Sequence, residues 1–426
     1  MLPDIFSIDP RLERLAGEAM ARAAAAFSRI EAVTEQNQRK VLGAFIANRV
    51  SESHFAPTTG YGYGDRGREV LDRVFADAMG APDALVRHSI VSGTHAITIA
   101  LFGVLRPGDT LLAATGAPYD TLEGVIGEKT AAPGSLREFG VRYREVPLDP
   151  AGRPDPSGIV RALEEEPSVR MVHIQRSRGY SLRPSLRVED IAPIVEISKR
   201  KAPDAIVMVD NCYGEFVERE EPLAVGADII AGSLIKNPGG GIAPTGGYIA
   251  GRRDLVELCS YRLTTPGTGR EIGCTLGNNR ELFMGAFHAP HVAGEALKTA
   301  VFASALFSQL GFGVTPTVEE KRGDIIQVML LEKPENLIAF CKGVQKGAPV
   351  DSFVVPEPSD MPGYDSQVIM AAGAFTLGSS IELSADAPLR EPYAAWMQGG
   401  LNYHSGQLGM LLAAQEMANE GLLNLQ

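Results

Sequence analysis

The chain has 426 residues, which at about 150 residues per domain corresponds to two or three domains. Apolar residues make up 45% and charged residues 22%, a balance that supplies sizeable hydrophobic cores and excludes intrinsic disorder. Acidic side chains outnumber basic ones by 52 to 40, giving a net charge of -12. Because such a chain has no basic surplus to meet a phosphate backbone, we expect no nucleic-acid partner.

The cellular compartment is predicted from features that the sequence lacks. The first ten residues show no basic segment followed by an apolar stretch, the pattern of a signal peptide. The longest near-apolar segment, residues 96–105, is too short to span a bilayer, which takes about 20 residues. The four cysteines are far apart and form no C-x-x-C pair, which argues against disulfides and a zinc site. We therefore expect a cytoplasmic protein with no membrane partner and no metal.

The N-terminal 57 residues predict a helical arm. Apolar residues from Leu12 onward recur at spacings of three and four, and a second periodic stretch covers residues 35–47. The pattern breaks at residues 51–57. Residues 58–65 then alternate glycine and tyrosine, which disfavours both a helix and a central strand, so we predict a loop that carries aromatic rings.

Residues 58–280 predict a large α/β domain. Short aliphatic runs alternate with helical patterns, as in a mostly parallel, doubly wound sheet covered on both faces. The predicted strands, seven in number, are residues 85–91, 110–114, 141–146, 170–175, 206–210, 229–232 and 247–250. The predicted helices between them are residues 94–105, 119–127, 156–166 and 188–202.

Residues 281–426 predict a long helix followed by a small α+β domain. The helix covers about residues 280–310, and we expect Pro290 to break it. The remaining predicted strands are residues 324–331, 352–355, 367–371 and 380–384, and the remaining helices are residues 334–347 and 402–421.

Lys236 is the first candidate for chemistry. It follows a predicted strand, precedes a glycine run that we expect to be flexible, and has the apolar neighbours Leu234, Ile235 and Pro238. Partial burial would lower the pKa of its ammonium group and free the amine to attack a carbonyl. The alternative for this residue taken alone is an ordinary lysine at a turn.

Polar residues also stand at the ends of other predicted strands, where a doubly wound sheet forms its ligand crevice. Asp210 ends one strand and is either a buried partner for a cation or a helix cap. Ser92, Gly93 and Thr94 open a helix and form either an anion site or a plain cap. Tyr119 opens the next helix and either stacks on a flat ring or packs on Pro118.

Together these residues supply an amine for an aldehyde, an acid, an anion-binding turn and a stacking ring. Pyridoxal 5'-phosphate needs this combination. The order and spacing also resemble the fold type I pyridoxal-phosphate enzymes, most closely the cystathionine/methionine lyase group and its aluminium-resistance or methionine γ-lyase-like branch. The resemblance covers nearly the whole chain, and its most specific segments are residues 92–96, 209–216, 232–241 and 382–392.

The resemblance implies a role for each matched residue. Lys236 would be the lysine attached covalently to the cofactor, with Asp210 at the ring nitrogen and Tyr119 stacked on the ring. The residues implied for the phosphate are Ser92, Gly93, Thr94 and Ser233. The loop bearing Tyr61, Tyr63 and Arg66 would reach into the active site of a dimer partner, and Arg390 in the small domain would bind the substrate carboxylate.

Two segments depart from the group's pattern. Ile235 stands where a hydroxyl residue is usual before the lysine, so one phosphate contact is missing or comes from elsewhere. Residues 175–181 replace an Asn-Pro motif with a donor-rich sequence that we expect to take over its contacts. His288 and His291 are better explained by packing than by metal binding, and we place Glu215 and Glu221 on a solvated face.

The function implied is that of a carbon–sulfur lyase, which carries out β- or γ-elimination on a small sulfur-containing amino acid. An aminotransferase or a γ-replacement enzyme on the same fold is the alternative, and a non-enzymatic binding protein is a more distant one. The resemblance also implies a homodimer as the catalytic unit, assembled into a homotetramer.

Overall fold

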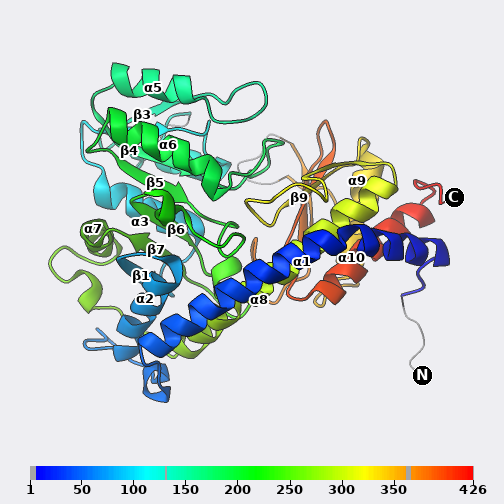
Figure 1. The fold of residues 1–426 in the computed structure, drawn as a ribbon, viewed down its shortest axis with the longest axis horizontal. Helices are drawn as coiled ribbons and strands as arrows, with labels where there is room; N and C mark the ends of the chain where they lie inside the picture. Colours follow the sequence, from blue (N-terminus) through cyan, green and yellow to red (C-terminus); the bar gives the residue numbers. More distant parts are fainter. Residues whose placement is uncertain (1–5, 130–131, 361–365, 426) are drawn as a thin grey trace. The chain divides into compact units, whose positions relative to one another are not determined.

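The computed structural model describes residues 6–129, 132–360 and 366–425, so the first five residues of the predicted arm lie outside the described part. The chain divides into two compact units. One consists of Met1–Thr34 with His291–Gln426, and the other of Glu35–Pro290. The boundaries fall within the two longest helices, α1 (Pro10–Ala47) and α8 (Asn279–Gln309), so each helix contributes to both units (Figure 1).

The unit of residues 35–290 is built on a seven-stranded sheet of order β1-β7-β6-β5-β4-β2-β3. Only β7 runs antiparallel to its neighbours β1 and β6, and the other pairs are parallel. Its strands are β1 (Asp83–Arg87), β2 (Thr110–Ala113), β3 (Arg142–Glu145), β4 (Val169–Gln175), β5 (Ile206–Asp210), β6 (Ile229–Ser233) and β7 (Gly247–Gly251).

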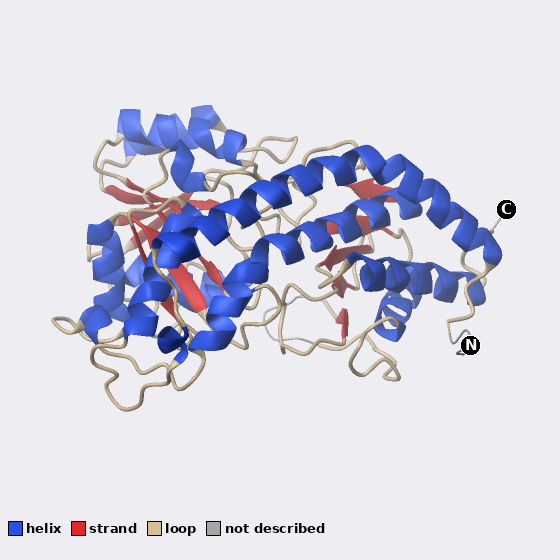
Figure 2. Ribbon diagram, turned by 60° about the horizontal axis from the view of Figure 1, so that its bottom comes forward, coloured by secondary structure: helices blue, strands red, loops and turns tan. Residues whose placement is uncertain are grey.

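Both faces of this sheet are covered, which is why its central strands are continuous apolar runs. Alternate residues of neighbouring strands, such as Met208 and Ile229, pack with helices α3 and α7 in one core. Figure 2 shows helices on both sides of the strands. The helices of this unit are α2 (Arg66–Met79), α3 (Gly93–Val104), α4 (Asp120–Ile126), α5 (Pro156–Glu165), α6 (Val188–Lys201) and α7 (Arg253–Leu263). Short 3-10 turns are η1 (Glu52–Phe55), η2 (Pro222–Val225), η3 (Asn237–Gly239) and η4 (Gly269–Glu271).

The other unit contains an antiparallel sheet of order β10-β11-β12-β9-β8. Its strands are β8 (Gly313–Thr315), β9 (Gln327–Leu330), β10 (Val368–Ala372), β11 (Ser384–Pro388) and β12 (Ala394–Gln398). Helices α9 (Pro334–Lys346) and α10 (Tyr403–Asn419) pack on each other, and their apolar residues share a core with the sheet. No helix among the described residues is both long enough and apolar enough to cross a membrane.

The sequence prediction of a mostly parallel α/β sheet is confirmed, strand by strand, in the larger unit. Three details of the prediction are wrong. Pro290 does not break α8, which runs through it. Residues 352–355 form no strand, and the strand expected at residues 380–384 begins only at Ser384. In the smaller unit the sequence analysis also missed β8 and β12.

Candidate active site

The ends of the parallel strands bring most of the predicted site residues together. Asp210 ends β5, Ser233 ends β6, and Gly93 opens α3 in the connection after β1. Parallel strands present their carboxyl ends at one edge of a sheet, where ligands of doubly wound folds bind. The segments meet closely, because a Cβ atom on Gly93 would lie 3.0 Å from the Cys212 sulfur and 3.5 Å from Ser233 Cβ.

Lys236 is held by tightly packed backbone rather than by the flexible segment that we predicted. It is half-buried and caps the short turn η3. In the glycine run that follows, Gly240 has a positive φ of 55°. A Cβ atom on Gly240 would lie 2.5 Å from the carbonyl oxygen of Gly285 in α8, and one on Gly239 would overlap the carbonyl oxygen of Leu234. These glycines are required because the backbones approach so closely.

The pKa of the Lys236 ammonium group is raised, so the predicted lowering is wrong. Burial does lower this pKa, as expected, but interactions with Tyr213, Cys212 and Asp210 outweigh it. The Lys236 Nζ atom lies over the ring of Tyr213, 3.6 Å from its centroid. In the chain by itself Lys236 is therefore a stabilised cation.

Asp210 provides the negative charge of the cluster. Its side chain is 3% exposed, and one carboxylate oxygen accepts the amide hydrogen of Cys212 at 3.1 Å. Burial raises the pKa of Asp210, while the bonds from Cys212 and the charges of Lys236 and Arg183 counteract this rise. In the described part of the chain no helix begins directly after β5, so the predicted alternative of a helix cap is wrong: the carboxylate supports a turn and is stabilised by the charges of Lys236 and Arg183.

The start of α3 shows the cap that was one of the two alternatives predicted for residues 92–94. Ser92 caps the helix, and its hydroxyl oxygen accepts the amide hydrogen of His95 at 3.0 Å. A helix leaves its first amide groups without intrahelical acceptors, so those of Gly93 and Thr94 suit an anion. The buried Ser233 lies beside Gly93, and its hydroxyl accepts the amide hydrogen of Ile235 at 3.4 Å.

Tyr119 is fixed at both ends. Its hydroxyl is 2.7 Å from the Thr94 side-chain oxygen, and that oxygen is 3.0 Å from the Thr121 hydroxyl. Its backbone amide donates to Gln175 Oε1 at 2.8 Å. Burial, followed by the negative charge of Asp210, raises the pKa of the Tyr119 phenol, so its hydroxyl is protonated near neutral pH.

The donor-rich segment after β4 supports this arrangement, although no sequence motif identified its residues. Gln175 Nε2 donates to the carbonyl oxygen of Ser177 at 3.2 Å, and Arg183 donates to the carbonyl oxygen of Gln175 at 3.0 Å. Sequence reasoning also missed Cys212 and Tyr213. Their signals were their position directly after Asp210 and their place in residues 209–216, one of the segments that carry the family resemblance.

A buried polar network lies behind the strand ends, and it overturns the placement of Glu215 and Glu221 on a solvated face. Both side chains are buried. Tyr248 donates to Glu215 at 2.9 Å, and Asn211 donates to Glu221 at 2.9 Å. Arg176 is wholly buried and pairs with Glu221 at 3.2 Å. Burial raises the pKa of Glu215 to about 8, so this carboxyl is protonated near neutral pH.

The other predicted residues lie on the surface. Tyr61 and Tyr63 are each 68% exposed and stack on each other, with ring centroids 5.4 Å apart. Arg68 anchors their loop through bonds to the carbonyl oxygens of Gly62 at 2.9 Å and Gly273 at 2.7 Å. Arg66, the first residue of α2, and Arg390, which follows β11 in the smaller unit, are exposed.

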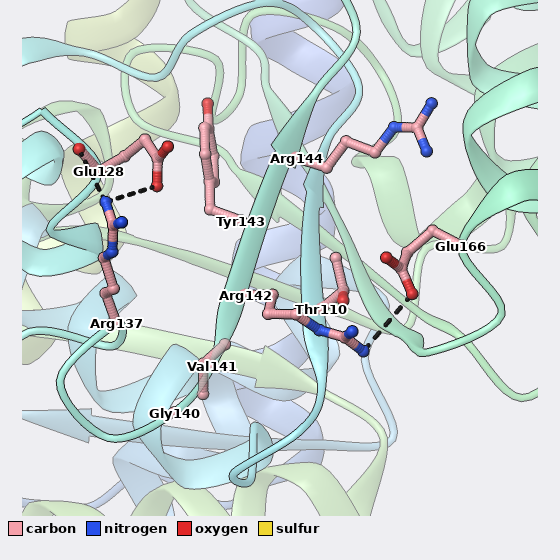
Figure 3. Close-up of a pocket in the computed structure, with 9 residues that line it drawn as sticks. All are labelled: Thr110, Glu128, Arg137, Gly140, Val141, Arg142, Tyr143, Arg144 and Glu166. Carbon is pink, nitrogen blue, oxygen red and sulfur yellow. Dashed lines mark hydrogen bonds and ion pairs between the residues drawn. The ribbon is translucent and has the colours of Figure 1, made fainter.

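A shallow depression runs along β3, the edge strand of the large sheet (Figure 3). Arg137 and Glu128 form an ion pair at one side of it, and Arg142 and Glu166 form another, each at 3.5 Å. Exposed pairs of this kind contribute little energy. The residues that line this depression do not include those of the Lys236 cluster.

The Lys236 cluster fits pyridoxal phosphate by the chemistry of its donors. It offers an amine, a buried carboxylate, a phenol ring and a helix N-terminus. The absence of a side chain at Gly93 also leaves space beside that N-terminus, which a Cβ atom would narrow. Among the described residues, no group of three or more His, Cys, Asp or Glu side chains is arranged to hold a metal ion.

Comparison with known proteins gives the family. Residues 12–418 match the methionine gamma-lyase family. The uncharacterized protein YnbB of Bacillus subtilis (strain 168) is 46% identical over 413 residues, covering 97% of this chain and 98% of YnbB. The L-methionine gamma-lyase of Pseudomonas putida is 30% identical over 175 residues, covering 40% of this chain and 37% of that enzyme.

Solved structures agree with this result. A carbon-sulfur lyase involved in aluminum resistance from Clostridium novyi NT is 51% identical, with a TM-score of 0.93 and 97% of each chain covered. The pyridoxal-5'-phosphate dependent protein YhfS of Escherichia coli shares the fold at 17% identity, with a TM-score of 0.62 and coverage of 91% of this chain and 96% of YhfS.

The fold is therefore that of the fold type I pyridoxal-phosphate enzymes. The chain belongs to the methionine gamma-lyase family, whose cofactor is pyridoxal phosphate, and the resemblance seen in the sequence is confirmed.

Proposed function

We propose that this protein is a pyridoxal-phosphate-dependent carbon–sulfur lyase that catalyses β- or γ-elimination on a small sulfur-containing amino acid. The main support is the cluster in which Lys236, Asp210 and Tyr119 meet beside the N-terminus of α3. The likeness to the Clostridium novyi carbon-sulfur lyase supports the same class of reaction.

Each residue of the cluster has a distinct task in this proposal. Bound pyridoxal phosphate supplies an electron sink that makes the Cα proton of an amino acid labile. Lys236 Nζ takes that proton, and the carboxylate of Asp210 holds the proton on the ring nitrogen. The Tyr119 hydroxyl, which is protonated near neutral pH, donates a proton to the departing sulfur.

Other residues bind and orient. The amides of Gly93 and Thr94, with the hydroxyls of Ser92 and Ser233, hold the phosphate through the charge of the α3 N-terminus. Arg390 binds the α-carboxylate of the substrate with its planar guanidinium group. The protein works in the cytoplasm as a homodimer within a homotetramer, and Tyr61, Tyr63 and Arg66 serve the active site of the partner subunit.

Product analysis tests the proposal. Purified protein supplied with pyridoxal phosphate should become yellow, and it should release ammonia and a keto acid from thioether amino acids. The chain length of the keto acid separates β- from γ-elimination. Transfer of the amino group to the cofactor, with no ammonia released, would establish an aminotransferase. Protein that stays colourless with added pyridoxal phosphate would refute the proposal.

Replacement of Lys236 tests the role of this lysine in the proposed reaction. Lys236→Ala should lower turnover by at least about 10²–10⁴-fold, the usual contribution of a general base, because no other amine replaces it. Reduction with borohydride followed by mass spectrometry should label Lys236 with the cofactor in the native protein and leave the variant unlabelled. Labelling of a different lysine in the native protein would contradict the assignment.

A further inference from the structure

The turn after β5 places an aromatic ring against Lys236. The Lys236 Nζ atom is 3.6 Å from the ring centroid of Tyr213, well within the range of a cation–π interaction. Tyr213 has a φ of 69°, in the left-handed region that bulky residues rarely adopt. Such a conformation has a cost and persists only where the surrounding structure enforces it.

The surroundings of the turn do enforce it. The buried side chain of Asn237, next to Lys236, donates to the carbonyl oxygens of Tyr213 at 3.1 Å and Glu215 at 2.9 Å. At the other end of the turn, Phe216 also has a positive φ, of 61°. Its amide donates to Glu221 at 2.9 Å. The turn is therefore tied both to the lysine segment and to the buried polar network.

We propose that Tyr213 is a positioning residue whose ring holds the Lys236 ammonium group after the lysine has taken up a proton. This role rests on the proposed function, in which Lys236 removes a proton from Cα. An aromatic face attracts the charged form of the lysine and has little attraction for the neutral amine. The ring therefore stabilises the protonated lysine that follows proton abstraction, and it keeps the Lys236 side chain in place for the next proton transfer.

Several other charged or titratable groups surround the same ammonium group. Asp210 and Cys212 act on it directly, from the end of β5 and from the turn. Arg183 and Tyr119 interact with Asp210, and Glu215 interacts with Cys212. The ring of Tyr213 adds a further partner for the cation to the charges of Cys212 and Asp210. Substitution of Tyr213 leaves these other groups in place, so it isolates the effect of the ring on the ionisation of Lys236.

The test is the ionisation of Lys236 in the full-length chain freed of cofactor. Trace labelling with acetic anhydride at a series of pH values, followed by mass spectrometry of the peptide containing Lys236, gives the pH of half-maximal labelling. Tyr213→Leu and Tyr213→Met remove the aromatic face and should lower this pH by about one unit. Tyr213→Phe keeps the face and should stay close to the native value.

Phe216→Leu is the matched control, because it removes a ring from the other left-handed position of the same turn. It should leave the labelling of Lys236 unchanged. An unchanged value in both Tyr213→Leu and Tyr213→Met would overturn the proposal, and so would an equal shift in Phe216→Leu. A full shift in Tyr213→Phe would assign the effect to the hydroxyl and also overturn it. Because no turnover is involved, the result is independent of whether the protein is a lyase.

Discussion

At the scale of single residues, burial and charge act against each other in the candidate active site. Burial disfavours the charged forms of Lys236 and Asp210 alike, yet each supplies the opposite charge that the other needs. A lysine with a raised pKa is protonated near neutral pH, so Lys236 must lose this proton before it can remove one from carbon.

The carboxylate of Asp210 gives the first prediction. Asp210→Asn keeps the size of the side chain and an acceptor for the Cys212 amide, but it removes the negative charge. We expect turnover to fall by about 10²–10³-fold, as when one preorganised electrostatic group is lost, with little change in the binding of substrate. Steady-state kinetics check this. Asp254→Asn, at an exposed position in α7, should keep native activity, and native turnover in Asp210→Asn would contradict the role.

Glu215 gives a prediction on pH and stability. Its pKa is raised from 4.5 to about 8 in the folded chain, so between these values the folded state holds a proton that the unfolded state has lost. Stability should therefore fall as pH rises through this window, by at most about 1.4 kcal/mol per pH unit. Glu215→Gln removes this dependence.

Urea unfolding at pH 6 and pH 8 measures the effect. Relative to the native chain, Glu215→Gln should gain about 2 kcal/mol of unfolding free energy between the two pH values. The exposed Glu220→Gln is the control and should follow the native chain at both. Parallel curves for the native chain and Glu215→Gln would show that Glu215 is already ionised in the folded state.

At the scale of elements, the contact between the glycine run after Lys236 and α8 fixes the position of the lysine. Gly240 combines a left-handed backbone with close contact to Gly285 and Ala289 of that helix. Gly240 therefore meets two requirements at once: it adopts a left-handed backbone conformation, and it has no side chain that would collide with α8.

Two alanine substitutions separate these requirements. Gly80 ends α2 with a φ of 68° and has open space where a Cβ atom would stand, so Gly80→Ala should lose only the cost of the conformation, about 1 kcal/mol. Gly240→Ala adds a clash with backbone and should lose roughly 1–3 kcal/mol more. Urea unfolding gives both values, and equal losses would mean that α8 adjusts to the added methyl group.

At the scale of the whole molecule, we propose that assembly explains the exposed Tyr61–Tyr63 pair. A stacked pair of tyrosines with 68% exposure each has apolar surface to cover, and a second copy of the chain is the partner that we propose. A symmetric dimer would give each subunit's loop to the active site of the other.

Mixing two inactive variants tests this assembly. Lys236→Ala lacks the lysine and Arg66→Ala lacks the loop charge, so each alone should be inactive or nearly so. In a mixed dimer, one of the two sites receives an intact lysine from one chain and an intact loop from the other. Random mixing after dissociation should restore about a quarter of the native activity. If the mixture stays as inactive as its components, the loop does not cross between subunits.

The sequence by itself determined the parallel sheet and the positions of Asp210, Ser92, Gly93, Tyr119 and Lys236. Period and strand length are local properties, and residues at strand ends converge in any sheet of this type. The family resemblance then supported pyridoxal phosphate as the cofactor. Short strands such as β8 and β12 were missed because pairing with neighbouring strands, which no local pattern records, stabilises them.

Only the tertiary structure decided the environments of these residues. The ring of Tyr213, the clamp from Asn237 and the burial of Glu215 all depend on chain segments that are distant in sequence. The direction of the Lys236 pKa shift depends on them too, because burial and neighbouring charge have opposite signs. The excess of acidic over basic side chains is likewise not confined to the surface. Asp210, Glu215 and Glu221 are buried and belong to the candidate active site and the polar network behind it.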